Sequence, residues 1–372
     1  MLLFTITAYA LAFCYVIIQG RFYWYWVELV EEKPHRKRDQ ASGVEWTVIV
    51  PARDEAEQIR QTLLSLKGQG AEIIVVNDHS TDDTASIVSE FKDVVLFNLP
   101  EGQSGKKAAL SYAMNKARGT WIATVDADVQ VSDNWLEALD STRKSDSIAI
   151  AGPVMLSPAT GWFERWQALD FSGMMLITGA SLQIGDFAMG NGANLAFSRA
   201  AFQEVGGYES EDGKESVSGD DMVLLGKLLK QFPGQIAFAK TPEAIVTTRP
   251  KQEVRSFIQQ RWRWSAKTGL NQQPSLTITL GLVWAFHLGL FIGIPLVMLG
   301  LMEQEALYMA WGCKIGVDYV ILRTAVRHFN QGGLMDWTYP LQSFVHALYV
   351  AGIGTLSLLP FEFEWKGRKA RR

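Results

Sequence analysis

Hydrophobic and polar positions divide this chain into a polar middle and two apolar ends. Residues 2–19 carry no charge and residues 276–302 almost none, and each run is long enough to cross the hydrocarbon core of a bilayer as a helix. Residues 340–360 form a further spanning candidate. We therefore predict an N-terminal transmembrane helix over 1–22, transmembrane or interfacial helices over 275–361, and a basic cytoplasmic tail over 362–372.

The number of C-terminal crossings stays open at this level. Segment 305–323 has the length to span, but Lys314 and Asp318 cost free energy in lipid unless they face protein or the interface. Three crossings after a single N-terminal one would put the basic tail outside, whereas an even number would keep it inside. We favour an even number, with 305–323 partly re-entrant or interfacial, or with 276–302 broken near Pro295.

Aromatic and basic residues follow the first apolar run. Residues 21–26 fit an aromatic belt at the membrane interface, and a basic cluster comes after them, formed by Lys33, Arg36, Lys37 and Arg38. By the positive-inside tendency, this cluster places the central region in the cytoplasm of a multi-pass protein of the cell (inner) membrane. A cleaved signal peptide competes with this interpretation. It fits less well, because no basic leader precedes the apolar run and no small-residue cleavage site follows it.

The polar middle alternates between strand and helix patterns. The β-branched runs at 46–50 and 72–76 predict buried parallel strands, and 55–67 between them has apolar residues at helical spacing. A second helix is expected to start near 80–83, and the pattern repeats as a strand at 94–97, a helix at 106–116 and a strand at 121–125. This order predicts an open α/β sheet of the Rossmann-like kind, with ligands at the carboxyl ends of its strands.

Composition and charge remove several classes of protein. The net charge is -4, and the sequence shows no basic stripe of the kind that nucleic-acid-binding proteins use. The only cysteines, Cys14 and Cys313, lie in hydrophobic stretches, so a disulfide framework and a CxxC metal site are excluded. No Gly-x-Gly-x-x-Gly follows the first strand and no Gly-Lys-Ser/Thr occurs, which disfavours dinucleotide-dependent oxidoreductases and P-loop NTPases.

Charged side chains stand at the predicted strand ends. Asp126 and Asp128, separated by one residue after a buried strand, could together hold Mg²⁺ or Mn²⁺, which favour oxygen ligands and share them with phosphates. Asp78 could accept hydrogen bonds from a nucleobase or ribose, and Lys106 follows a glycine-containing loop that could bring its ammonium to a phosphate. Taken singly, these features also fit a solvated turn, a helix cap and a solvated loop.

Two later segments could also take part in chemistry. Asp220 and Asp221 precede an apolar helix, where a carboxylate could act as a general base or simply cap the helix. Residues 260–264 (QRWRW) interleave two guanidinium groups with two indoles just before the apolar end of the chain. Anchoring at the membrane interface is the simpler explanation for that second segment.

In this order and spacing, the segments resemble the family 2 glycosyltransferases of the GT-A fold. The resemblance is to their membrane-integrated branch, which includes cellulose and hyaluronan synthases and ceramide glucosyltransferase. It covers roughly residues 46–270, and it implies a glycosyltransferase domain over 44–270. The motifs that carry it are VIVPARDE at 48–55, VNDHSTDDT at 76–84, GKKAAL at 105–110, DAD at 126–128, NGAN at 191–194, VGGY at 205–208, Asp220-Asp221, and Gln260-x-x-Arg263-Trp264.

The resemblance implies a role for each matching residue. Pro51, Arg53 and Glu55 would lie against the nucleoside of the donor, and Asp78 would bind its base. Lys106 would approach the phosphates, and Asp126 would contact the nucleotide while Asp128 ligates the divalent cation, Mg²⁺ or Mn²⁺, with Asp126 beside it at the metal site. Asp221 would be the general base with Asp220 supporting it. The motif that lines the acceptor and the donor diphosphate near the membrane would consist of Gln260, Arg263 and Trp264.

The implied activity is an inverting transfer of a hexosyl or N-acetylhexosaminyl group from a nucleotide-diphospho-sugar to a membrane-associated acceptor, either a lipid or a lipid-linked glycan. A small processive polysaccharide synthase is the alternative, and an inactive nucleotide-sugar-binding membrane scaffold is a distant one. Two departures stand out. Asp54 occupies a place where relatives often have Asn, and the membrane portion is shorter than in typical processive synthases, which argues against a secretion channel.

Overall fold

The computed structural model describes residues 1–32, 45–209, 220–266, 273–359, 362–365 and 368–371. Contacts divide the chain into two compact units that alternate along the sequence. One, here the helical unit, comprises residues 1–28, 159–180 and 250–372; the other, here the sheet unit, comprises 29–158 and 181–249. The predicted basic cluster at 33–38 lies outside the described residues, as do Lys366 and Arg372 of the predicted tail.

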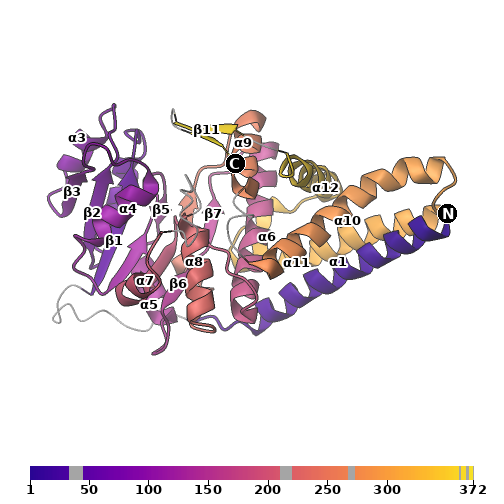
Figure 1. Ribbon diagram of the computed structural model, residues 1–372, viewed down its shortest axis with the longest axis horizontal. Helices are drawn as coiled ribbons and strands as arrows, with labels where there is room; N and C mark the ends of the chain where they lie inside the picture. Colours follow the sequence, from indigo (N-terminus) through magenta and orange to yellow (C-terminus); the bar gives the residue numbers. More distant parts are fainter. Residues whose placement is uncertain (33–44, 210–219, 267–272, 360–361, 366–367, 372) are drawn as a thin grey trace. The chain divides into compact units, whose positions relative to one another are not determined.

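A seven-stranded sheet forms the core of the sheet unit (Figure 1). Its strand order is β3-β2-β1-β4-β8-β6-β9, in which β3, β2, β1 and β4 are parallel to one another and β8 is antiparallel to both of its neighbours. The open α/β sheet predicted from the sequence is therefore confirmed. Its strands are β1 (Trp46–Ala52), β2 (Glu72–Asn77), β3 (Val94–Asn98), β4 (Trp121–Thr124), β6 (Ala149–Ala151), β8 (Leu195–Ser198) and β9 (Ile236–Phe238).

The helices of this unit follow the predicted pattern, with shorter ends. The helix expected over 55–67 begins only at residue 59, because the backbone of residues 54–56 donates hydrogen bonds to side chains of residues 80–84 instead. The helix expected over 106–116 ends at Met114. The helices are α2 (Ile59–Leu66), α3 (Thr84–Ser89), α4 (Lys106–Met114), α5 (Trp135–Thr142), α7 (Arg199–Glu204), α8 (Asp220–Gln231) and the 3₁₀ turn η2 (Pro242–Ala244).

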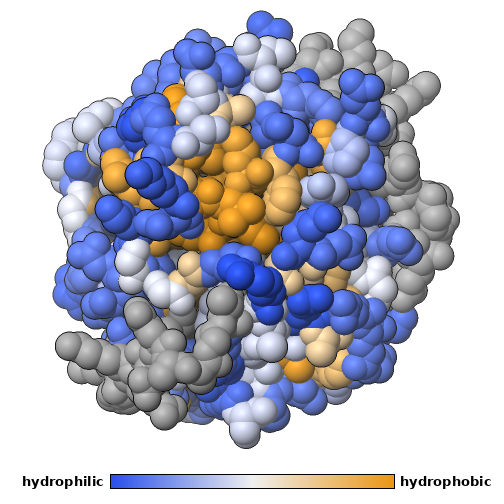
Figure 2. Space-filling view, turned by 90° about the vertical axis from the view of Figure 1, so that its left-hand side faces the viewer, coloured by the Kyte–Doolittle hydropathy of each residue, from blue (hydrophilic) through white to orange (hydrophobic). Residues whose placement is uncertain are grey.

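Strand β3 is an edge of the sheet, and apolar side chains are exposed there. Val95 on this strand has 40% of its surface exposed, and its neighbours in β3 are half-buried. Figure 2, which looks onto the face beside α3 and β3, shows a hydrophobic patch surrounded by hydrophilic residues. None of the predicted site residues belongs to β3.

Asn194 ties the main sheet to a second, smaller sheet of β5 (Gln130–Val131), β10 (Val246–Thr248) and β7 (Val154–Leu156). Its amide nitrogen donates to the carbonyl oxygens of Pro153 and Ala244, each at 2.8 Å, and its amide oxygen accepts from the indole N–H of Trp135 at 3.0 Å. The side chain is fully buried. A single residue thus satisfies three buried polar groups.

We expect Asn194→Ala to lower the free energy of unfolding by about 3 kcal/mol, because each buried group left without its partner carries a desolvation cost of about 1–3 kcal/mol. Thermal unfolding of the purified chain in detergent measures the effect. The exposed Asn115→Ala substitution is the control. Equal melting temperatures for the two variants would show that the three hydrogen bonds do not stabilise the fold.

The helical unit contains three long helices that lie side by side, α1 (Leu2–Glu28), α10 (Pro274–Met298) and α11 (Gln304–His328) (Figure 1). Helix α12 (Tyr339–Leu356) runs in a different direction and is seen nearly along its axis in Figure 1. The other elements are α6 (Trp162–Ile184), whose last turn belongs to the sheet unit, α9 (Val254–Ala266), the 3₁₀ turn η4 (Gly332–Leu334) and the hairpin β11 (Glu362–Trp365) and β12 (Arg368–Arg371).

The structure corrects the expected break near Pro295 and the re-entrant form of 305–323, while an interfacial position for 305–323 stays a prediction. Pro295 lies inside α10, which continues to Met298 without a break. Residues 305–323 form part of one continuous helix, α11, which packs along α1 and α10 rather than turning back. The charges of Lys314 and Asp318 are accommodated because both side chains are buried and paired with each other.

Two helices are long and apolar enough to cross a membrane among the described residues, namely α1 and α10. The first is longer than predicted, since the helix continues through the aromatic stretch 21–26 to Glu28. Helices α11 and α12 are not among the two that meet this test of length and apolar composition, and α11 buries its charged pair inside the bundle. Membrane association of the helical unit follows from α1 and α10, and the number of crossings is part of the proposal below.

Candidate active site

The ends of strands β1 and β2 are joined by side-chain hydrogen bonds. The carboxylate of Asp54 accepts from the backbone N–H of Thr81 at 2.7 Å, and the backbone N–H of Glu55 donates to the hydroxyl of Thr84 at 2.8 Å. The hydrogen bond from Thr81 lowers the pKa of Asp54. Asp54 has a φ of 49°, a conformation that Asn and Asp tolerate better than most residues, so the departure from Asn at this position preserves the turn. The loop with Pro51, Arg53 and Glu55 is held in place.

Asp78 links the end of β2 to the start of α4. Its carboxylate accepts a hydrogen bond from the backbone N–H of Gly105 at 2.9 Å, and a guanidinium nitrogen of Arg53 lies 3.9 Å from the same oxygen. Gly105 has a φ of 96°, which a residue with a side chain rarely adopts. The cap position of the following helix α3 is occupied by Asp83, so capping that helix is not what Asp78 does. This buried carboxylate instead places the first residue of α4, Lys106.

Lys106 forms an ion pair with Asp126 at the end of β4. Helix α2 fixes the turn that carries Asp126 and Asp128, since the hydroxyl of Thr62 on that helix donates a hydrogen bond to the carbonyl of Ala127 at 2.8 Å. Both acidic side chains are half-buried. The structure therefore brings together Lys106 and Asp126, which the sequence places 20 residues apart.

The antiparallel direction of β8 adds a second chain segment to this edge of the sheet. Because β8 runs opposite to β4, residues that enter β8 lie beside residues that leave β4, and Thr124 pairs with Leu195. The hydroxyl of Thr124 donates to the carbonyl of Gly192 at 2.9 Å, and the N–H of Gly192 donates to the carboxylate of Asp221 at 2.9 Å. The motif at 191–194 thereby connects the end of β4 to the start of α8.

Lys106, Asp126, Gly192 and Asp221 consequently meet at one place. A Cβ atom on Gly192 would lie 3.2 Å from the ammonium nitrogen of Lys106 and 3.6 Å from a carboxylate oxygen of Asp221. The second oxygen of Asp221 accepts from the backbone N–H of Met222 at 2.9 Å, so the carboxylate is oriented by two backbone donors. Asp220 begins α8 beside it. Sequence reasoning found the acidic residues here and missed Gly192 as the one that brings them together.

The donor set suits a hard divalent cation that is shared with a ligand. Among the residues that the structure describes, no three His, Cys, Asp or Glu side chains gather into a complete metal site. Asp126 and Asp128 offer carboxylate oxygens, and Mg²⁺ in particular is often bound by one or two carboxylates with the remaining positions filled by substrate phosphates and water. Two carboxylates at a strand end therefore fit a cation that arrives with a diphosphate.

The predicted motif at 260–264 lies in the helical unit, on α9. Gln260, Arg263 and Trp264 stand at positions i, i+3 and i+4, which share one face of a helix, and all three are half-buried. Arg261 is fully buried instead, with its guanidinium 3.1 Å from the carboxylate of Asp170 and 4.5 Å from the ring of Trp264. Of the two arginines assigned to interfacial anchoring, Arg261 is an internal residue.

Three comparisons bear on this arrangement. Residues 47–206 match the family described as Glycosyl transferase family 2. The chain is 24% identical over 242 residues to the poly-beta-1,6-N-acetyl-D-glucosamine synthase of Staphylococcus aureus (strain COL), and 24% identical over 245 residues to that of Staphylococcus epidermidis. Each match covers 61% of this chain and 58% of the relative, so the chain spans somewhat more than half the length of these curated relatives.

A solved structure resembles the whole chain. It is the mannosyltransferase PcManGT from Pyrobaculum calidifontis in complex with GDP-Man and Mn²⁺, with a TM-score of 0.59 and 18% sequence identity. The likeness covers 96% of this chain and 97% of that one, so it includes segments on both sides of the matched family region. At this identity the likeness concerns the fold.

Sheet topology and the structural match show that the chain has the GT-A fold, and residues 47–206 match the family 2 glycosyltransferases.

Proposed function

We propose that this chain transfers a sugar from a nucleotide-diphospho-sugar to a hydroxyl of a membrane-associated acceptor, a lipid or a lipid-linked glycan, with inversion at the anomeric carbon. The meeting of Lys106, Asp126, Gly192 and Asp221 at the edge of the sheet is the observation that carries the proposal. The ammonium of Lys106, which suits a diphosphate, thus lies close to the carboxylate of Asp126, which suits a metal, and to that of Asp221, which suits a general base. In this proposal residues 44–270 are the glycosyltransferase domain.

The donor would lie along the strand ends. Pro51, Arg53 and Glu55 would face its nucleoside, and Asp78 its base. Lys106 would stabilise charge on the phosphates, and Asp126 and Asp128 would hold Mg²⁺ or Mn²⁺ against the diphosphate. When bound, such a cation neutralises negative charge that develops on the departing nucleoside diphosphate. A complex of the similar mannosyltransferase contains GDP-Man and Mn²⁺, which supports a divalent cation here as well.

Asp221 would remove the proton of the acceptor hydroxyl. A neutral hydroxyl is a poor nucleophile, so a positioned base lowers the barrier to attack on the anomeric carbon. Its two backbone hydrogen bonds, from Gly192 and Met222, orient the carboxylate. The proton passes to Asp221 as the new glycosidic bond forms, and the nucleoside diphosphate leaves from the opposite face of the sugar. Asp220 would support the base.

The acceptor would come from a membrane that α1 and α10, both long and apolar enough to cross one, would span. We place the protein in the cell (inner) membrane as a multi-pass chain with its catalytic domain in the cytoplasm, where nucleotide sugars are found. In this arrangement Gln260, Arg263 and Trp264 would line the acceptor and the donor diphosphate.

A small processive synthase is the second candidate, and the matched relatives favour it, because they are named as synthases of a poly-N-acetylglucosamine. The two activities differ in product length. A single added sugar on an extracted lipid supports the first candidate, and a ladder of products supports the second.

A donor screen tests the proposal. Purified chain is incubated with each of the common nucleotide-diphospho-sugars, Mg²⁺ or Mn²⁺ and membrane lipid extract, and release of the nucleoside diphosphate is measured. We expect release with one donor class, dependent on lipid extract and abolished by a chelator. Binding of a donor without release under every condition would favour an inactive nucleotide-sugar-binding scaffold instead.

A further inference from the structure

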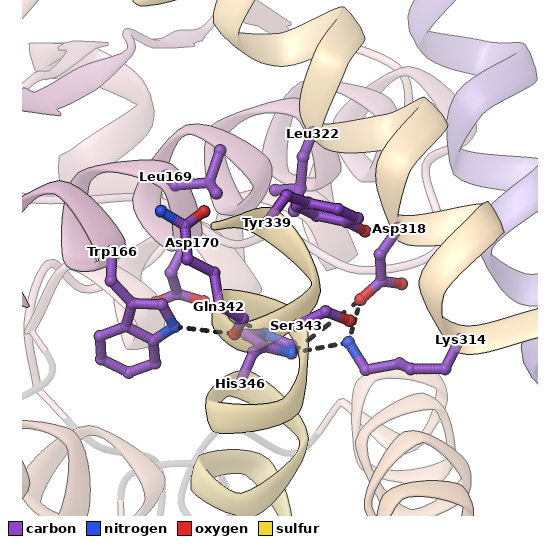
Figure 3. A pocket seen from close by; sticks show the side chains of 10 residues that line it. All are labelled: Trp166, Leu169, Asp170, Lys314, Asp318, Leu322, Tyr339, Gln342, Ser343 and His346. Atoms are coloured by element: carbon purple, nitrogen blue, oxygen red, sulfur yellow. Dashed lines mark hydrogen bonds and ion pairs between the residues drawn. The ribbon is translucent and has the colours of Figure 1, made fainter. Parts of the chain in front are cut away.

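A connected series of polar side chains runs through the interior of the helical unit. The hydroxyl of Tyr15 on α1 donates to Asp318 on α11, and Asp318 forms an ion pair with Lys314 one turn away. The ammonium of Lys314 lies 3.1 Å from Nδ1 of His346 on α12. Figure 3 shows Lys314 and His346 reaching toward each other from their two helices across a small pocket.

From His346 the series continues to α9. Nε2 of His346 lies 3.3 Å from one carboxylate oxygen of Asp170 on α6, and the other oxygen lies 3.1 Å from the guanidinium of Arg261. The guanidinium then stacks over aromatic rings, at 4.5 Å from the centroid of Trp264 and 5.0 Å from that of Phe257. Five helices are thus joined through side chains, from α1 to α9.

The partners fix the protonation of the central histidine. A lysine ammonium can only donate, so Nδ1 of His346 must accept, and its proton resides on Nε2, where it is donated to Asp170. The imidazole therefore bridges two ion pairs, Lys314 with Asp318 and Arg261 with Asp170. Two positive and two negative charges balance, and each charged group faces an opposite charge.

Stability alone does not account for such a network. Buried ion pairs recover little more than the cost of removing their charges from water, and well-packed apolar residues often stabilise a fold equally well. A connected network of hydrogen bonds and ion pairs does, however, hold its members in one arrangement.

The end of the series lies at the predicted acceptor motif. Arg261 sits between Gln260 and Arg263 in sequence, and its guanidinium covers Trp264, the third member of the motif. The orientation of α9 about its axis, and so the direction of Gln260 and Arg263, depends on where Arg261 is held. We propose that Asp170 and His346 are positioning residues: through Arg261 and Trp264 they fix the face of α9 that carries Gln260 and Arg263. This inference rests on the function proposed above for that motif.

The test compares two substitutions of His346 with a matched control. His346→Leu removes both hydrogen bonds, whereas His346→Gln keeps one acceptor and one donor. The control is His287→Leu, since His287 lies in the same bundle, with its ring 5.7 Å from that of His346, and is fully buried where His346 is half-buried, but its Nδ1 donates to the carbonyl of Val283 in its own helix. Melting temperatures of all three are measured in detergent beside their activities.

We expect His346→Leu to lower kcat about 10- to 100-fold, because small misplacement of a positioning group has effects of this size. Affinity for the nucleoside diphosphate should fall by a smaller factor than kcat, since the strand-end residues proposed to hold the donor are untouched, and His346→Gln should restore most of kcat. An unchanged kcat in folded His346→Leu would overturn the proposal. So would an equal loss of kcat in His287→Leu.

Two further measurements decide the case if that variant does not fold or if no acceptor is found. Arg261→Lys keeps the charge that faces Asp170 but loses the planar group that stacks on Trp264, so we expect the same loss of kcat. Hydrogen exchange of the α9 amides needs no turnover, and we expect faster exchange there in Arg261→Lys than in His346→Gln or His287→Leu. Wild-type exchange in α9 would overturn the positioning role alone, whereas absence of transfer by the wild-type chain would overturn only the proposed function.

Discussion

Asp221→Asn is expected to abolish sugar transfer while donor binding survives. An amide cannot take up the proton of the acceptor hydroxyl, and loss of a general base costs about 10²- to 10⁴-fold in rate. The substitution changes few atoms, and its amide oxygen can still accept the hydrogen bond from the backbone of Gly192 or of Met222. The geometry of the site should therefore persist while its chemistry fails.

Initial rates of transfer to the acceptor, together with titration of the nucleoside diphosphate, separate chemistry from binding in this variant. Asp133→Asn, an exposed carboxylate elsewhere in the sheet unit, is the control for loss of a negative charge. If Asp221→Asn membranes transferred sugar at the wild-type rate, the base would have to be another residue. If donor affinity fell as far as the rate, Asp221 would act in donor binding instead.

Asp128→Ala is expected to remove the metal dependence of donor binding. Without this carboxylate the protein would offer only Asp126, which is already paired with Lys106, so the cation would lose its second protein ligand. We expect about 100-fold weaker donor binding, in line with the several kcal/mol that a bound cation contributes to charge stabilisation. Transfer should fall at least as far.

A chelator gives this prediction its control. Donor affinity of the wild-type chain should fall on addition of EDTA, whereas that of Asp128→Ala should be low with or without it. Isothermal titration with the nucleoside diphosphate selected in the donor screen measures both. A variant whose affinity still rose on addition of Mn²⁺ would assign the cation to other ligands.

Local patterns in the sequence predict the half of the sheet that is parallel. The runs at 46–50 and 72–76 are β-branched and end in polar residues, and both become buried strands with those residues at their carboxyl ends. Asp78, Asp126 and Lys106 were found in this way, because the position of a residue at a strand end depends on its immediate neighbours. The resemblance to family 2 glycosyltransferases then placed these residues in one family of folds.

Contacts between distant segments were not predictable in the same way. Strand β8 enters the sheet antiparallel, and nothing in its four residues indicates that direction or the contact of Gly192 with Asp221, 29 positions later. Arg261 reads as an interfacial arginine because its partner Asp170 lies 91 residues earlier. The charges in α11 left the position of that segment open, since contact of Lys314 and Asp318 with His346 arises only when α11 and α12 pack together.

The alternation of the two units along the chain has a consequence for biosynthesis. Residues 159–180 are part of the helical unit and interrupt the sheet unit in sequence. The sheet unit therefore cannot be isolated by cutting the chain at its two outer boundaries. A fragment of residues 29–249 would retain most of α6 and expose apolar residues that are now buried, such as Leu169 and Phe171. During synthesis, residues 159–180 leave the ribosome before α10 to α12. The apolar side chains of α6 therefore stay without their final packing partners until those helices have been made, and the helical unit is completed last.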